Sequence, residues 1–275
     1  MTADPSFDAL LPAEMAAKAE AVGVAKASLP LARMVPLGVL AGAFIGLGAM
    51  FSTVVTADTA LTPGVSRLLG GLVFSLGLVL VVISGAELFT GNTLIVVAAV
   101  GRRVRPASLL RNWAVVYVSN FAGAAATAAL VVASGRLDAG DGAIGARALA
   151  IAEAKSGLGV IEAVASGVLA NALVCLAVWM TLSARSLVDR VAVIIPPITA
   201  FVACGFEHSV ANMFFFPVAL FHGTEPASET SWTSFLAGNL LPVTIGNIIG
   251  GAVLVGLVYW FVYLRPARSQ SVHTP

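Results

Sequence analysis

Six apolar runs, each long enough to cross a lipid bilayer as a helix, constrain the fold of this chain more than any other feature. They cover roughly residues 34–56, 68–100, 113–132, 160–182, 191–221 and 236–264. A transmembrane helix needs about 20 apolar residues, and only helices and closed barrels satisfy their backbone hydrogen bonds inside a bilayer. Charged residues make up only 11% of the 275 positions, against about 25% in soluble domains. The chain is therefore predicted to be an all-α integral membrane protein with six transmembrane helices in a lipid bilayer.

The basic residues predict which loops face the cytoplasm. Eleven of the 15 lie on one side of the predicted spans: Lys18, Lys26, Arg33, Arg102, Arg103, Arg105, Arg111, Arg185, Arg190, Arg265 and Arg268. Loops rich in lysine and arginine remain on the cytoplasmic side. Both termini are therefore predicted to be cytoplasmic, as an even number of spans requires.

Three regions are predicted along the chain. Residues 1–33 form a cytoplasmic N-terminal region with an amphipathic helix (PAEMAAKAEAVGVAKA), which lacks the basic start and apolar core of a cleaved signal peptide. This helix either covers the first span or gates the cytoplasmic mouth, and both interpretations stay open. Residues 34–264 form the transmembrane domain, and the polar residues 265–275 form a disordered cytoplasmic tail.

Two polar octapeptides, GAELFTGN and GFEHSVAN, lie inside the second and fifth runs. Both have the form Gly-x-Glu-x-x-x-x-Asn, and they begin 120 residues apart, at Gly85 and Gly205. Each lies in a run of about 30 residues, which is too long for one straight span. A helix broken by a short turn at each octapeptide explains both the length and the glycines.

The two halves of the chain resemble each other beyond the octapeptides. GVLAGA at 38–43 recurs as GVLANA at 167–172, and Asn112, Asn120 and Gly123 recur at Asn239, Asn247 and Gly250. Because each half, 34–133 and 158–264, has three spans, the halves must have opposite orientations. This pattern predicts an inverted repeat with broken second and fifth helices, a plan that many transporters share.

The octapeptide residues are interpreted first as a scaffold for the helix breaks. Breaking a helix in a bilayer frees backbone N–H and C=O groups that must be paired. The glutamates are expected to accept from the freed N–H groups, and the asparagines to pair with both kinds; direct substrate or proton chemistry is the alternative. The scaffold residues are Gly85, Glu87, Asn92, Gly205, Glu207 and Asn212.

His208 has no counterpart in the first octapeptide, where Leu88 stands at the matching position. Ionisable groups at membrane depth are expensive and usually functional, although a structural histidine is the alternative. Desolvation favours the neutral imidazole, which can exchange a proton with a passing weak acid. Thr90 and Asn171 are expected to complete a polar point around His208 at the centre of a narrow pore.

Apolar side chains near this point are predicted to form dry constrictions, which a small neutral acid crosses more easily than an ion. They are Phe74, Leu78, Leu88, Phe89 and Phe201. Lys155, predicted to lie in the outer loop before the fourth span, is expected to attract anions to the outer mouth, unless it is simply solvated. The pattern predicts no cofactor and no metal site, because His222 and His273 fall in a loop and in the tail.

Two other classes of function are less well supported by the residues. An enzyme using Glu207 and His208 as an acid–base pair would lack an accompanying activated serine, cysteine or metal cluster, so the chain is not expected to be an enzyme. A water or glycerol pore would share the broken helices, but apolar constrictions suit water poorly. Nothing in the chain predicts binding to nucleic acid.

Four stretches resemble the formate/nitrite transporter family: SGAELFTGNTL, GVLANALVCLAVWM, GFEHSVANMFFFP and LLPVTIGNIIGG. The resemblance runs from about residue 12 to residue 264. It implies an aquaporin-like protomer in a homo-pentamer, with one pore per protomer for small monovalent anions or their conjugate acids. By position, His208 matches the family's central histidine, Thr90 its broken-helix threonine, and Lys155 its outer lysine. Asn171 and the five constriction residues match family positions as well.

Within that family, PAEMAAKAEAVGVAKASLPLARM and ARSLVDRVAVIIPP are more similar to the formate branch. The expected function is a pH-dependent channel or proton-linked transporter for formate in a bacterial or archaeal cytoplasmic membrane. Nitrite, hydrosulfide or another small monocarboxylate is the alternative substrate for the same architecture.

Small and sulfur-containing residues raise two packing questions. Gly38, Gly42 and Gly46 lie at a spacing of four, which permits close helix approach either between protomers or within one. Cys175 and Cys204 lie in apolar runs and are expected to be packing residues rather than a disulfide.

Overall fold

The computed structural model of the chain describes residues 9–57, 60–223 and 230–265. All regular elements in these ranges are helical, and no strand occurs in them. The predicted tail, apart from Arg265, lies outside the described residues, as do residues 1–8 and His273. An all-α protein is therefore confirmed for the part of the chain that the structure describes.

The first half contains a short N-terminal helix, two long helices and a broken helix between them. Its elements are α1 (Pro12–Ala27), α2 (Leu31–Val55), α3 (Pro63–Phe74), α4 (Leu76–Ser84), α5 (Phe89–Asn92), η1 (Thr93–Ile95), α6 (Val96–Val100) and α7 (Pro106–Ala133).

The second half begins with a short helix and ends with a long helix that includes several π-helical turns. Its elements are η2 (Arg136–Asp138), α8 (Ala143–Ser156), α9 (Val160–Thr181), α10 (Leu187–Ala203), α11 (Ser209–His222), η3 (Ser234–Leu240), α12 (Leu241–Ile248), η4 (Ile249–Leu257) and η5 (Trp260–Leu264).

Five helical stretches are long and apolar enough to cross a membrane. They are Leu31–Val55, Pro63–Ser84, Pro106–Ala133, Val160–Thr181 and Ser234–Leu264. Two shorter apolar helices, Phe89–Val100 and Ser209–His222, complete the apolar set. Several helices begin before the predicted runs because a proline starts the first turn, as Pro63 and Pro106 do.

Both octapeptides interrupt helices. Helix α4 ends at Ser84, Gly85 follows with φ of 73°, and α5 begins at Phe89. In the second copy α10 ends at Ala203, Gly205 has φ of 76°, and α11 begins at Ser209. A positive φ is easily adopted only by glycine, which explains why each octapeptide begins with this residue.

The predicted glycine spacing serves packing within one chain. A Cβ atom on Gly42 would collide with the backbone of Asn120 in α7, and one on Gly123 would collide with the backbone of Val39. Gly38 and Gly46 also lie against side chains of α7. These glycines therefore bring α2 and α7 into close contact inside the protomer.

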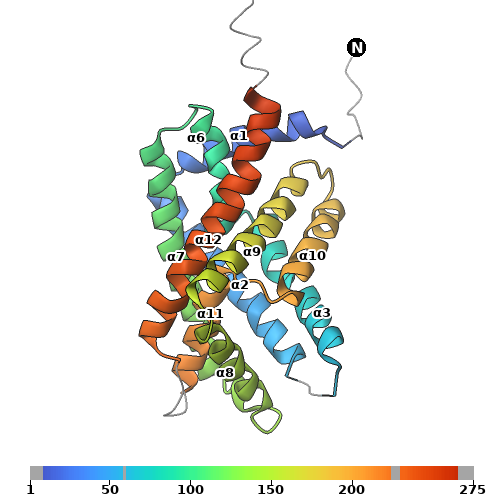
Figure 1. The fold of residues 1–275 in the computed structure, drawn as a ribbon, viewed down its shortest axis with the longest axis vertical. Coiled ribbons are helices and arrows are strands. Elements are labelled where there is room, and N and C mark those ends of the chain that lie inside the picture. The colour runs from blue at the N-terminus through green and yellow to red at the C-terminus, as the bar shows by residue number, and fades with distance from the viewer. Residues whose placement is uncertain (1–8, 58–59, 224–229, 266–275) are drawn as a thin grey trace, which may run out of the picture.

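Figure 1 shows α1 and α8 at opposite ends of the long axis, with the last helix ending near α1.

Three local predictions need correction. Lys155 lies in α8 rather than in a loop, and His222 is the last residue of α11. Cys175 is buried as expected, but Cys204 is exposed because it follows the end of α10 at the break.

Candidate functional site: a buried histidine between two helix breaks

His208 is the residue before the first turn of α11 and is only 2% exposed. Its Nδ1 atom accepts a hydrogen bond from the backbone N–H of Ala211, 3.0 Å away, and so caps the helix. An accepting Nδ1 carries no proton, so the neutral ring carries its proton on Nε2. Nε2 lies 2.9 Å from the Thr90 hydroxyl, to which it donates. The predicted pair of His208 and Thr90 is therefore in direct contact.

Asn171 belongs to the same cluster but contacts Thr90 rather than His208. Its amide donates to the Thr90 carbonyl at 3.2 Å, to the Thr93 hydroxyl at 3.2 Å and to the Asn247 carbonyl at 2.6 Å. Cys175 lies beside them, with Sγ 3.3 Å from the Thr93 hydroxyl. Asn171 thus fixes the backbone at Thr90 and ties it to the last span.

Two of the aromatic residues expected near the histidine, Phe74 and Phe201, pack beside its ring. The Phe201 ring stacks on the His208 ring with centroids 5.8 Å apart, and Phe74 meets Phe201 edge-on at 5.6 Å. Phe74, Phe201 and His208 all line one cavity of about 390 Å³. The histidine and both phenylalanines are therefore part of one cavity wall.

The other three predicted constriction residues are buried but do not line this cavity. Leu78 and Leu88 belong to the main apolar core. Phe89 packs edge-on against Tyr117 and Trp113 of α7, with ring centroids 4.8 Å and 6.2 Å away.

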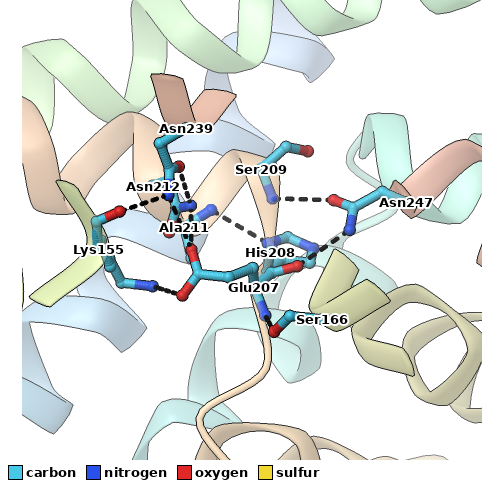
Figure 2. A network of polar contacts seen from close by, with 9 residues as sticks. All are labelled: Lys155, Ser166, Glu207, His208, Ser209, Ala211, Asn212, Asn239 and Asn247. Carbon is cyan, nitrogen blue, oxygen red and sulfur yellow. Dashed lines mark hydrogen bonds and ion pairs between the residues drawn. The ribbon is translucent and has the colours of Figure 1, made fainter. Parts of the chain in front are cut away.

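Glu207 anchors a polar network beside the cavity (Figure 2). Its Oε1 atom pairs with Lys155 Nζ at 2.7 Å, and its Oε2 atom accepts from the Asn212 amide at 2.7 Å. Asn212 also donates to Asn239 at 2.6 Å, and Asn239 donates to the Lys155 carbonyl at 3.1 Å. The network therefore ties helix α8 to the second break.

Glu87 makes the same set of contacts at the first break. It pairs with Lys26 of α1 at 2.7 Å and accepts from the Asn92 amide at 2.7 Å. Asn92 donates to Asn112 at 2.9 Å, and Asn112 donates to the Lys26 carbonyl at 3.0 Å. Helix α1 thus contacts the first break in the way that α8 contacts the second.

The backbone freed at each break is paired by a further asparagine. Asn120 accepts from the Phe89 N–H at 2.9 Å and donates to the carbonyls of Gly38 and Glu87. Asn247 accepts from the Ser209 N–H at 2.9 Å and donates to the carbonyls of Gly167 and Glu207.

The expectation that the glutamates accept from freed backbone N–H groups is therefore wrong. In the described part of the chain their carboxylates accept from lysine and asparagine side chains instead. Sequence reasoning also missed Lys26, Asn112, Asn120, Asn239 and Asn247 as parts of the site. The sequence did indicate the four asparagines, because Asn112 and Asn120 of the first half recur as Asn239 and Asn247 in the second half. Lys26 was indicated only weakly: it lies 129 residues before Lys155, and the same offset separates GVLAGA from GVLANA.

No group of three or more His, Cys, Asp or Glu side chains that could hold a metal ion occurs among the residues that the structure describes. A buried histidine on the wall of a cavity, next to a helix break in a bundle of apolar helices, is typical of a membrane transport protein.

Comparisons with known proteins identify the family. The family model described as "Formate/nitrite transporter" matches residues 13–261. The chain is 44% identical to the formate channel FocA of Escherichia coli strain K12, over 96% of this chain and 98% of that protein. It is 40% identical to a probable formate transporter of Methanothermobacter thermautotrophicus, over 92% and 97% of the two chains.

Two solved structures have the same fold. One, described as a pentameric formate channel with formate bound, has a TM-score of 0.79 and 42% identity, covering 86% of this chain and 98% of that chain. The other, described as an FNT family ion channel, has a TM-score of 0.82 and 31% identity, covering 90% and 98%. The chain belongs to the formate/nitrite transporter family and is an integral membrane protein. Since that family consists of transporters and channels, the enzyme alternative is set aside.

Proposed function

We propose that this protein is a pH-dependent channel or proton-linked transporter for formate across the cytoplasmic membrane. The observation that carries the proposal is the contact between the Thr90 hydroxyl and the ring of His208, which lines a cavity together with Phe74 and Phe201. Relatives named as formate channels, at 44% and 40% identity, support formate over the other small anions.

The proposed architecture is an aquaporin-like inverted repeat with six spans. The halves 34–133 and 158–264 would each contribute three spans, with the second and fifth broken at Gly85 and Gly205. The equivalent hydrogen bonds of Glu87 and Glu207, and of Asn120 and Asn247, support this two-fold relation. Both termini would face the cytoplasm, with residues 1–33 as a cytoplasmic region before the domain. The pentameric assembly of a structural relative supports a homo-pentamer.

The proposed route runs from the cavity beside Lys155 to the His208–Thr90 contact. Formate would enter as an anion, combine near the histidine with a proton taken from the aqueous phase, and cross the apolar residues as the neutral acid. A neutral species is favoured because burying an unpaired charge costs several kcal/mol or more. The Nε2–H of His208 is directed at Thr90, so a substrate displacing that hydroxyl would receive a hydrogen bond from the ring.

The test is a flux measurement with purified protein in liposomes. Uptake of formate and nitrite is measured side by side, with a pH gradient imposed and then removed. Formate well ahead of nitrite, and accelerated by an inward proton gradient, is the expected result. Nitrite flux equal to or greater than formate flux would contradict the proposal that formate is the preferred substrate. Indifference of formate flux to the gradient would contradict proton coupling while leaving the architecture in place.

A further inference from the structure

We propose that Arg67 and Arg147 form a carboxylate-binding site at the outer mouth of the cavity that leads to His208. Arg67 comes from α3 and Arg147 from α8, and both side chains line the same cavity as Lys155. The site takes a small carboxylate anion, and it rests on the proposed function only in that this anion is formate on its way to the histidine.

The Arg147 side chain is held in place through one edge only. Its Nε donates to the Thr56 hydroxyl at 3.1 Å, and that hydroxyl donates in turn to the Ser52 carbonyl at 2.8 Å. Within the described ranges, Nε is the only atom of this guanidinium that makes a hydrogen bond. Its two terminal nitrogens are therefore available to a ligand. Ser52 and Thr56 line the cavity too, so the polar wall continues from α8 to α2.

Among the described residues, the two guanidinium groups supply the positive charge of the cavity that no carboxylate pairs with. Lys155 also lines it, but its ammonium is paired with Glu207 at 2.7 Å. In the described part of the chain the ion pairs involve Lys26 and Lys155, and neither arginine pairs with a carboxylate. Attraction of an anion into this cavity thus depends on the arginines more than on the lysine.

The electrostatics of Arg147 also indicate that the arginines attract an anion into this cavity. Partial burial and, second, the nearby charge of Arg67 lower the pKa of Arg147 below its ordinary value. Two like charges in one partly buried cavity are unfavourable without a counter-ion. An anion bound between them relieves that repulsion.

A carboxylate suits this pair better than a spherical anion. A guanidinium presents parallel N–H donors that match the two oxygens of a carboxylate. Chloride offers no such two-point geometry. The site is therefore expected to select for the planar anion before it reaches the phenylalanines.

The test labels native protein in liposomes with phenylglyoxal, which modifies arginine, and maps the modified residues by mass spectrometry. Formate should protect Arg67 and Arg147 relative to an equal concentration of chloride. The protection should reach about tenfold when formate exceeds its dissociation constant tenfold. The exposed Arg136 of η2 is the control and should not be protected. Equal labelling of Arg147 in formate and chloride at every concentration would overturn the proposal.

A flux measurement on variants gives an independent readout. Arg147→Gln should raise the half-saturating formate concentration for entry from the α8 face several-fold, with a smaller effect on maximal flux. Arg136→Gln should change neither. Protection of the arginines in a protein that does not conduct formate would contradict the proposed function but support the proposed site. Normal formate flux without protection would remove the site and keep the function.

Discussion

At the scale of single residues, His208 combines a structural contact and a functional one. Its Nδ1 atom caps α11 while its Nε2 atom contacts Thr90. Leu88, at the matching position of the first octapeptide, has a similar extended backbone, with φ of −104° against −116° for His208. The extended residue is thus common to both breaks, and the imidazole is the addition in the second.

The two contacts of His208 can be separated by substitution. Asparagine is among the best helix-capping residues, whereas loss of a cap costs about 1 kcal/mol. We expect His208→Asn to unfold at nearly the wild-type temperature but to lose the pH dependence of formate flux. His208→Leu, which imitates the first octapeptide, should lower the unfolding temperature as well. Thermal unfolding in detergent and liposome flux measure the two effects. Wild-type flux and pH dependence in His208→Asn would show that the ring is not needed.

Asn120 and Asn247 are expected to be essential for stability. Each makes two hydrogen bonds to backbone groups at a helix break and a third to a carbonyl of the neighbouring α2 or α9, and each is fully buried. Leaving a buried backbone group unpaired costs about 1–3 kcal/mol. Asn247→Ala should therefore lower the unfolding temperature strongly. Ser134→Ala, which removes an exposed local hydrogen bond, should change it little. Equal unfolding temperatures for the two variants would contradict this role of Asn247.

At the scale of helices, hydropathy and repeat patterns predicted the apolar runs and both breaks. The octapeptides were predicted as breaks because each lies in a run too long for one straight span and begins with a glycine. The pairing of Lys26 with Glu87 was not predicted, because it joins residues 61 positions apart that no local pattern connects. The glutamates' true partners were missed for the same reason: which side chain lies nearest depends on how α1 and α8 pack on the bundle.

Close packing of α2 on α7 yields a prediction about these two helices. A methyl group on Gly42 or Gly123 would collide with backbone atoms of the opposite helix, which cannot move as a side chain can. Overpacking of this kind costs about 1–3 kcal/mol. Gly42→Ala should lower the unfolding temperature and the yield of folded protein. Gly64→Ala, at a position with nothing within 4 Å, is the matched control. A wild-type unfolding temperature for Gly42→Ala would mean that the two helices are not held this closely.

At the scale of the whole molecule, similar polar networks lie beside two unequal cavities. The cavity at the α8 end has a volume of about 390 Å³ and includes Arg67 and Arg147. The one beside α1 has a volume of about 40 Å³, and Lys26 is the basic residue among its described lining residues. Lys18 occupies the position equivalent to Arg147, 129 residues earlier, but it donates to the Leu182 carbonyl. The two ends of the molecule are therefore similar at the two glutamates and different in the cavities beside them.

This difference between the two cavities predicts that the two faces of the membrane bind formate unequally. An anion arriving at the α8 end meets two arginines, whereas one arriving at the α1 end meets Lys26 already paired with Glu87. Formate entry should therefore saturate at a several-fold lower concentration from the α8 face. Initial rates in right-side-out and inside-out membrane vesicles, with the pH equal on both sides, measure this quantity. The double variant Arg67→Gln/Arg147→Gln should remove most of the difference, because it leaves each of the two cavities with one paired lysine as its basic lining residue. Equal half-saturation from the two faces of the wild-type protein would show that the arginines do not contribute to capture. A difference that persists in the double variant would assign it to the cavity shapes instead.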